Sequence, residues 1–154
     1  MGEAEGVTSE QACFRIGLSA VIERGGQYLL ARRRDIGWWN LVGGGLEYGE
    51  TVEQGLRREV REEIGAEIRI VRPTGIYPKP QKREVVLTFL CQLTSDSPPP
   101  GVSDEISEVR WFARGEFPDR LLPKHRQRLE DAQRGDLATV LRNQLTTTAQ
   151  DQGL

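Results

Sequence analysis

The chain has 154 residues, of which 21 are Lys or Arg and 23 are Asp or Glu, so its formal net charge is -2. This length makes one ordinary domain with a real core. The near balance of charge excludes a global field that would recruit nucleic acid or an anionic membrane, so any basic site must be local. No apolar stretch approaches a membrane span and the polar N-terminus lacks a signal-peptide core, so we expect a soluble, cytoplasmic protein.

The first half of the chain predicts two strands and a helix. Residues 13–23 alternate apolar and polar side chains, which is typical of a half-buried strand, and a turn at 24–26 leads to a second strand at 27–33. After the glycines at 43–45, the charged segment has helical periodicity. Thr51 and Gln54 fit a capping box and Gly65 suits a left-handed C-terminal cap, which predicts a helix over 52–64.

The second half predicts three more strands, at 67–73, 84–93 and 108–112. A basic, proline-broken stretch at 77–83 and a loop at 94–104 separate them. Residues 123–134 and 136–145 have the pattern of two C-terminal helices. We expect flexible tails at 1–12 and 146–154, which leaves 13–145 as a single domain. One helix amid strands, with more helix at the end, predicts an α/β fold with a mixed sheet covered by helices.

The predicted helix at 52–64 separates its side chains by type. An aliphatic residue at every fourth position makes the core stripe, formed by Val52, Leu56, Val60 and Ile64. Acids lie on one flank of this stripe, namely Glu59, Glu62 and Glu63. Basic residues lie on the other, namely Arg57, Arg58 and Arg61. Like charges three or four residues apart cost a few tenths of a kcal/mol each, a penalty that a divalent cation would remove. A solvated, salt-bridged helix face is the alternative.

The glycines and the charged residues stand in one register: Gly44, five residues, Glu50, seven residues, Arg58-Glu59-Val60, one residue, Glu62-Glu63, one residue, Gly65-Ala66. This resembles the signature of the Nudix (MutT-like) hydrolases, G-x5-E-x7-R-E-U-x-E-E-x-G-U, in which U is a bulky aliphatic residue. Ala66 is smaller than the residue expected there, and Val42 stands where many members have proline. The resemblance implies an α/β/α sandwich around a mixed sheet and cleavage of nucleoside diphosphates linked to another moiety.

The resemblance also implies roles for matched residues. Glu59, Glu62 and Glu63 are similar to the family's carboxylate ligands for Mg²⁺ or Mn²⁺, and the carbonyl of Gly44 would complete the coordination. The ion would bridge the diphosphate and orient an attacking water. Arg58 is the candidate for holding a ligand carboxylate in place, with a surface ion pair as the alternative.

Four further residues have supporting parts in this interpretation. Glu50 supports the glycine loop or an outer metal, or else only adds favourable charge at the helix N-terminus. Gly43 and Gly65 are structural. Many family members add a glutamate from a later loop, and of the acids Asp104, Glu105 and Glu108 we favour Glu105, because it lies in a loop that can reach the helix. An ordinary acidic loop is the alternative.

The sequence says less about the substrate. Trp38 and Trp39 could stack on a nucleobase, or form a hydrophobic plug. Three basic residues could grip phosphate or ribose oxygens, or belong to a solvated loop: Lys79, Lys82 and Arg83. His125 is expected at the surface without a role. We expect a small nucleotide substrate, such as a nucleoside triphosphate, ADP-ribose or a nucleotide sugar.

Other functions stay open on the sequence. Family members are often homodimers, although no residue here establishes one. The same fold can serve as a non-catalytic nucleotide sensor, but such proteins commonly lose motif glutamates. Removal of pyrophosphate from RNA 5′ ends would call for a longer basic surface than this composition offers.

Overall fold

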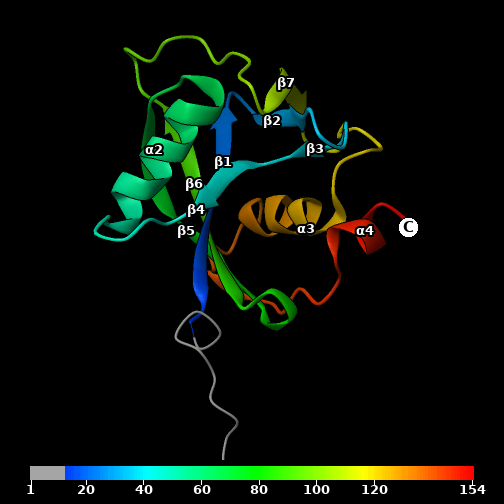
Figure 1. Ribbon diagram of the computed structural model, residues 1–154. Helices are drawn as coiled ribbons and strands as arrows, with labels where there is room; N and C mark the ends of the chain where they lie inside the picture. Colours follow the sequence, from blue (N-terminus) through cyan, green and yellow to red (C-terminus); the bar gives the residue numbers. More distant parts are fainter. Residues whose placement is uncertain (1–12) are drawn as a thin grey trace, which may run out of the picture.

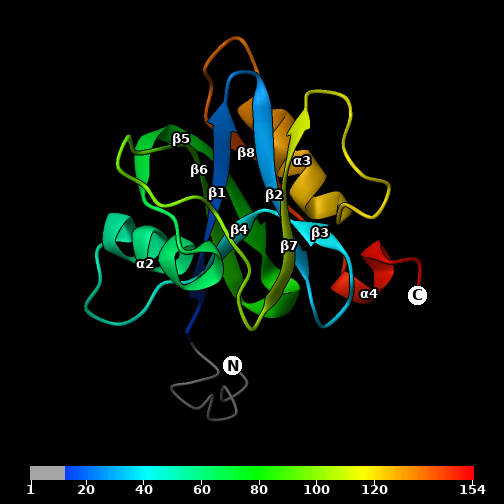
Figure 2. The same cartoon turned by 90° about the horizontal axis from the view of Figure 1, so that it is seen from above.

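The computed structural model describes residues 13–154, so the segment 1–12, expected to be a flexible tail, lies outside the described residues. Helices α2 (Val52–Ile64) and α3 (Pro123–Ala132) cover opposite sides of the strands (Figures 1 and 2). This three-layer α/β/α arrangement around a mixed sheet is the fold that the sequence predicts. Among the described residues, no helix has the length and apolar character that crossing a bilayer requires.

Strand β1 (Arg15–Arg24) is the centre of the sheet. It pairs in parallel with β6 (Glu84–Leu93), from Arg15 opposite Glu84 to Ile22 opposite Cys91. On its other edge it pairs with β4 (Val42–Gly45), which is antiparallel to it. The glycines of β4 are therefore held against the middle of the sheet.

The remaining strands extend the sheet in both directions. β2 (Gln27–Arg33) forms a hairpin with the end of β1 and pairs with β3 (Trp39–Asn40) and β7 (Ile106–Ala113). On the other side β6 pairs with the antiparallel β5 (Ile68–Lys79). β5 is longer than the predicted 67–73, because bulges at Ile70/Arg72 and Pro73/Gly75 let the strand continue past a proline that cannot donate to the ladder. A short 3-10 turn, η1 (Pro80–Lys82), then leads into β6.

The core lies on both faces of β1. Leu18 and Ile22 belong to the cluster under α2, whereas Val21 belongs to the cluster that includes Leu129 of α3. On α2 the predicted stripe is confirmed, with Leu56, Val60 and Ile64 buried and Val52 packed at the edge. Burial of each large aliphatic side chain contributes about 1.5–3 kcal/mol, so this stripe fixes α2 and the acids beside it on the sheet.

Both predicted ends of α2 are confirmed. The Thr51 hydroxyl accepts the N–H of Gln54 at 3.1 Å, and the Gln54 side chain accepts the N–H of Thr51 at 2.9 Å. Gly65 ends the helix at φ 65°, in the left-handed region. The helix therefore starts and stops where the local sequence dictates.

The prediction of a helix over 136–145 is wrong. This segment runs extended and forms β8 (Val140–Leu141), parallel to β5. Backbone N–H groups of Arg142 and Gln144 donate to the carbonyls of Ile76 and Pro78, at 3.1 and 3.0 Å. The edge of β5 thus supplies the hydrogen-bond acceptors that a helix would have found within itself. The segment is therefore extended although its leucines have helical spacing.

The segment 146–154, expected to be a tail, contains a helical turn and packs on α3. This turn, α4 (Thr148–Asp151), begins at Thr147, whose hydroxyl accepts the N–H of Gln150 at 3.1 Å. The carboxylate of Asp151 lies 2.6 Å from the ammonium of Lys124 on α3. The C-terminal segment also contributes Thr148 to the lining of a pocket that includes Lys124.

Candidate active site

The glycines of β4 bring backbone directly against the acids of α2. A Cβ on Gly44 would lie 2.3–2.5 Å from the carboxylate atoms of Glu59, and one on Gly43 would lie 2.0 Å from the carbonyl oxygen of Leu18. The N–H of Gly43 also points at Glu63, at 3.4 Å from its Oε2. Only glycine permits this approach, which places peptide groups beside two desolvated carboxylates.

Arg58 ties the helix to the loop before it. Its Nε and Nη2 donate to the two carboxylate oxygens of Glu50 at 2.7 and 2.9 Å, and Nη2 also donates to the Gly45 carbonyl at 2.9 Å. Its Nη1 donates to Glu59 at 2.9 Å and to Glu62 at 3.2 Å. The helical wheel put Arg58 on the flank away from the acids, but its long side chain reaches across to them. With 20% of its side chain exposed, it is not a loose surface pair.

Glu50 supports the loop. Besides the two bonds from Arg58, its Oε1 accepts the N–H of Glu47 at 2.9 Å. The hydrogen bond from Arg58 holds the pKa of the Glu50 carboxyl below its ordinary value. A paired bond from a planar guanidinium fixes both distance and orientation, so the Glu50–Arg58 contact sets where the glycine loop meets α2.

The acids of α2 sit in unequal surroundings. Burial raises the pKa of Glu63 to about 8, and the charges of Glu59 and Glu105 push it in the same direction against the Gly43 N–H. Burial also raises the pKa of Glu59, which Arg58 opposes. Glu62 keeps 59% of its side chain exposed. Desolvated carboxylates this close together are unfavourable as anions unless a cation joins them.

The structure brings Glu105 to these acids. A pocket of about 530 Å³ is lined by Glu47, Arg58, Glu59, Glu62, Glu63, Ser103, Asp104 and Glu105. Glu108 instead points along β7, where it bonds Arg110 and lies 3.8 Å from Arg32. Of the three acids weighed from the sequence, Asp104 and Glu105 line this pocket and Glu108 does not, and the charge of Glu105 acts on both Glu59 and Glu63.

The site has the donor chemistry for a hard divalent cation. Within residues 13–154 no three His, Cys, Asp or Glu side chains are already arranged as a metal-binding group. Arg58 donates to both Glu59 and Glu62. The oxygen donors, the close approach of the Gly44 backbone to Glu59 and the raised pKa of the buried acids nevertheless fit Mg²⁺ or Mn²⁺, which prefer carboxylate and carbonyl oxygens. The metal and its ligand set stay predictions.

The residues predicted to bind substrate separate into two groups. Trp39 is only 7% exposed and packs edge-on against Phe112 with ring centroids 5.2 Å apart, so it is the hydrophobic plug and offers no free face to a base. Trp38 is half-buried in the turn before β3. Lys79 and Lys82 line a second pocket next to the β4 glycines, whereas Arg83 is exposed outside that lining.

Sequence reasoning missed His125. Its Nδ1 accepts the N–H of Leu41 at 3.1 Å, and it lines the second pocket. Burial holds the pKa of His125 well below its ordinary value, so the ring is neutral, as an acceptor nitrogen requires. Its spacing from the buried Leu121 and Leu129, four residues on either side, was the signal that this face of α3 points inward.

Comparison with known proteins agrees with this architecture. The model of the NUDIX domain family matches residues 14–132. A MutT-like protein of Streptomyces ambofaciens is 37% identical over 115 residues, which cover 73% of this chain and 71% of that protein. A putative 8-oxo-dGTP diphosphatase of Bacillus subtilis (strain 168) is 26% identical over 136 residues, covering 87% and 85%. The crystal structure of a NUDIX hydrolase from Nitrosomonas europaea has a TM-score of 0.74 at 26% identity, covering 87% of this chain and 80% of that one. Since the family model spans well over half of the sequence, the chain belongs to the Nudix family of hydrolases.

Proposed function

We propose that the protein hydrolyses a diphosphate bond in a compound that links a nucleoside diphosphate to another moiety, with Mg²⁺ or Mn²⁺ as its cofactor. The observation that carries the proposal is the contact of Gly44 with Glu59, where backbone lies so close to a partly desolvated carboxylate that a Cβ at this position would have to displace it. The putative activity of the Bacillus subtilis relative belongs to the same class of reaction.

The acids would divide the work between binding and proton transfer. Glu59, Glu62 and Glu63 would hold the ion together with the Gly44 carbonyl. When bound, the ion would supply neutralisation of the diphosphate charge and acidification of a water. Arg58 would keep Glu59 aimed at the site through its 2.9 Å hydrogen bond. Glu105 would accept the proton of the attacking water as the bond to the leaving phosphate breaks.

The test is phosphate release from a panel of nucleoside triphosphates, ADP-ribose and nucleotide sugars, with Mg²⁺, with Mn²⁺ and with chelator. Coupling enzymes convert each product to phosphate. We expect at least one compound to be turned over with kcat/KM of about 10⁴ M⁻¹s⁻¹ or more, and the activity to vanish with chelator. Glu59→Gln should lower kcat by about 100-fold or more. Glu108→Gln, the same change in an acid held away from the site, is the matched control.

Two outcomes would contradict the proposal. Full activity of a Glu62→Gln, Glu63→Gln double variant on every substrate would show that these two carboxylates are not needed for hydrolysis. Binding of a nucleotide that raises the melting temperature, with no turnover of any compound, would favour a non-catalytic sensor instead.

A further inference from the structure

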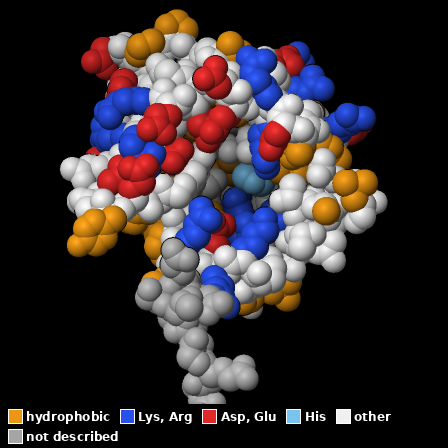
Figure 3. Space-filling model, viewed as in Figure 1, with side chains coloured by type: hydrophobic (Ala, Val, Ile, Leu, Met, Phe, Trp, Pro, Cys, Tyr) orange, Lys and Arg blue, Asp and Glu red, His pale blue; other side chains and the backbone are white. Residues whose placement is uncertain are grey.

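A second pocket, of about 500 Å³, adjoins the acid-lined site across the β4 glycines. Arg33, Asn40 and Gly43 line both this pocket and the cavity that reaches Glu63 and Glu105. Figure 3 shows acidic side chains on one side of a hollow and basic side chains on another, with the pale blue histidine inside. We call this hollow the basic pocket, after the cations in its lining: Arg15, Arg33, Lys79, Lys82, Lys124 and Arg128.

The basic pocket keeps an excess of positive charge after its ion pairs are counted. Glu84 is the one carboxylate among the lining residues, and it lies 3.0 Å from the ammonium of Lys79. Asp35 and Asp151 neutralise Arg33 and Lys124 from outside the lining. Six cations against three carboxylates leave a net charge of +3 around one cavity. The whole chain has a net charge of -2, so this excess is local.

The most buried of these cations, Arg128, donates its hydrogen bonds to a neutral side chain. The Arg128 side chain is in a residue 3% exposed, and its Nε and Nη2 both donate to the same oxygen of Gln144, at 3.0 and 2.8 Å. Its guanidinium also lies over the ring of Tyr77, 5.6 Å from the centroid. Burial lowers the pKa of Arg128 to about 10. A buried charge whose hydrogen bonds go to a neutral amide is costly even with the charges of Glu84 and Asp151 nearby, and an anion entering the pocket would offset that cost.

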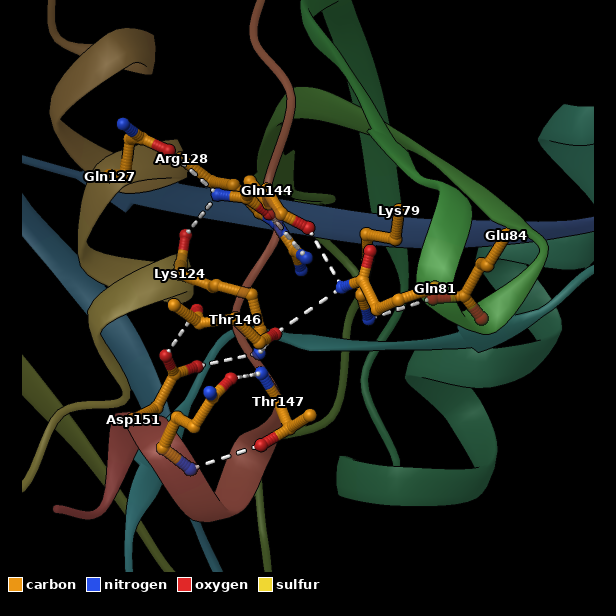
Figure 4. Close-up of polar contacts among 11 residues, drawn as sticks. Lys79, Gln81, Glu84, Lys124, Gln127, Arg128, Gln144, Thr146, Thr147 and Asp151 are labelled. Atoms are coloured by element: carbon orange, nitrogen blue, oxygen red, sulfur yellow. Dashed lines mark hydrogen bonds and ion pairs between the residues drawn. The ribbon is translucent and has the colours of Figure 1, made fainter. Parts of the chain in front are cut away.

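The C-terminal segment holds two of these cations, Lys124 and Arg128, in place. Figure 4 shows residues of this segment, of α3 and of the β5–β6 connection meeting around the pocket. Lys124 is held by Asp151 at 2.6 Å and by the carbonyl of Thr146 at 2.8 Å. The side chain of Gln144 accepts hydrogen bonds from Arg128, and its backbone carbonyl accepts one from the side-chain amide of Gln81 at 2.9 Å. These two charged groups are therefore pre-organised, which lowers the entropy lost when a ligand is bound.

The described lining offers no platform for a base. Among residues 13–154, no Phe, Tyr or Trp lines the basic pocket, and its large apolar side chains are Leu18, Leu41, Val86 and Leu122. Nucleobases are held by stacking on aromatic rings, whereas Lys and Arg recognise phosphate oxygens by charge-assisted hydrogen bonds. The chemistry of the pocket thus favours an anionic group over a flat, neutral ring.

We propose that the basic pocket binds a phosphate group carried by the substrate beyond its diphosphate bond. The inference rests on the proposed function, which puts the diphosphate at the acids of α2, and it narrows the substrate class. The preferred substrate would be a diphosphate-linked compound whose retained or leaving moiety has a phosphate ester of its own.

The first arm of the test measures binding with chelator present, so that it does not depend on catalysis. Calorimetric titration near 0.15 M salt compares ribose 5-phosphate, AMP, adenosine and inorganic phosphate. Both phosphate esters should bind at least about ten-fold more tightly than adenosine. Lys82→Gln should weaken their binding about three-fold or more, whereas Arg83→Gln, which removes a neighbouring cation outside the lining, should change it less than about two-fold. Equal binding of adenosine and AMP, or equal loss in the two variants, would overturn the inference.

The second arm measures hydrolysis of matched pairs with Mg²⁺: coenzyme A with dephospho-coenzyme A, and 2′-phospho-ADP-ribose with ADP-ribose. At least one phosphorylated member should have a kcat/KM about ten-fold above its partner, and Lys82→Gln should reduce that ratio. Equal kcat/KM values within both pairs would overturn the inference and leave the proposed function intact, even if inorganic phosphate binds. Binding of the esters without hydrolysis of any diphosphate would overturn the proposed function and leave the pocket as an anion site.

Discussion

Replacing Glu63 by Gln should make the metal-free protein more stable, and the gain should grow with pH. Burial raises the pKa of Glu63 from 4.5 to about 8, so between these values the folded state keeps a proton that the unfolded state has released. Stability then falls as pH rises through this window. At about 1.4 kcal/mol per unit of pH, the full difference is on the order of 5 kcal/mol, an upper bound reached above pH 8. Glu63→Gln removes this cost while its amide oxygen can still accept the Gly43 N–H.

The assay is urea unfolding in chelator at pH 5, 7 and 9. Parent and variant should differ by about 1 kcal/mol or less at pH 5 and by several kcal/mol at pH 9. Glu53→Gln, an exposed acid of the same helix paired with Arg57, is the control and should show no growing difference. A Glu63→Gln effect of the same size at pH 5 and pH 9 would refute the reasoning. Added Mg²⁺ should recover stability at pH 9 in the parent more than in the variant.

Three further predictions concern the same region. Gly44→Ala should lower kcat about 100-fold, because its Cβ would displace Glu59 by about 1 Å, and an unchanged kcat in steady-state assays would contradict the close approach. Arg58→Lys keeps the charge but loses the paired contact with Glu50, so it should lower kcat and increase proteolysis of the glycine loop. Parental kcat together with parental resistance to proteolysis would show that the paired contact is dispensable. Trp39→Ala should lower the free energy of unfolding by about 3–5 kcal/mol with little change in KM. A raised KM at parental stability would instead indicate that Trp39 contacts the substrate.

Features governed by short-range signals were predicted well. The capping box at Thr51, the left-handed Gly65 and the aliphatic stripe all act within one or two helical turns, and together they place both ends of α2 correctly. Because the acids lie on that helix, the register also predicts that Glu59 and Glu63 come close to the glycines. A local pattern is sufficient where the chain satisfies its own hydrogen bonds.

Features that depend on distant partners were not predictable in this way. Leu137, Leu141 and Leu145 have helical spacing, yet all three are exposed because the backbone of this segment pairs with β5. The ring of His125 accepts the N–H of Leu41, a residue far from it along the sequence, and this contact holds it inside the domain. The reach of Arg58 to the acids likewise depends on the loop acid Glu50, which a helical wheel does not contain.

The position of β1 also governs when the site can assemble on the ribosome. β1 is the first of the described strands to be made, but it shares two residue pairs with β2, whereas eight pairs join it to β6. Until residues 84–93 emerge, one edge of this apolar strand has no partner from the rest of the sheet, and loop-closure entropy makes such a distant pairing slow. The glycines and α2 are already synthesised by then. The nascent enzyme therefore contains all the motif residues before β1 has paired with β6 to complete the sheet that orients them. This interval is when chaperone binding would matter most.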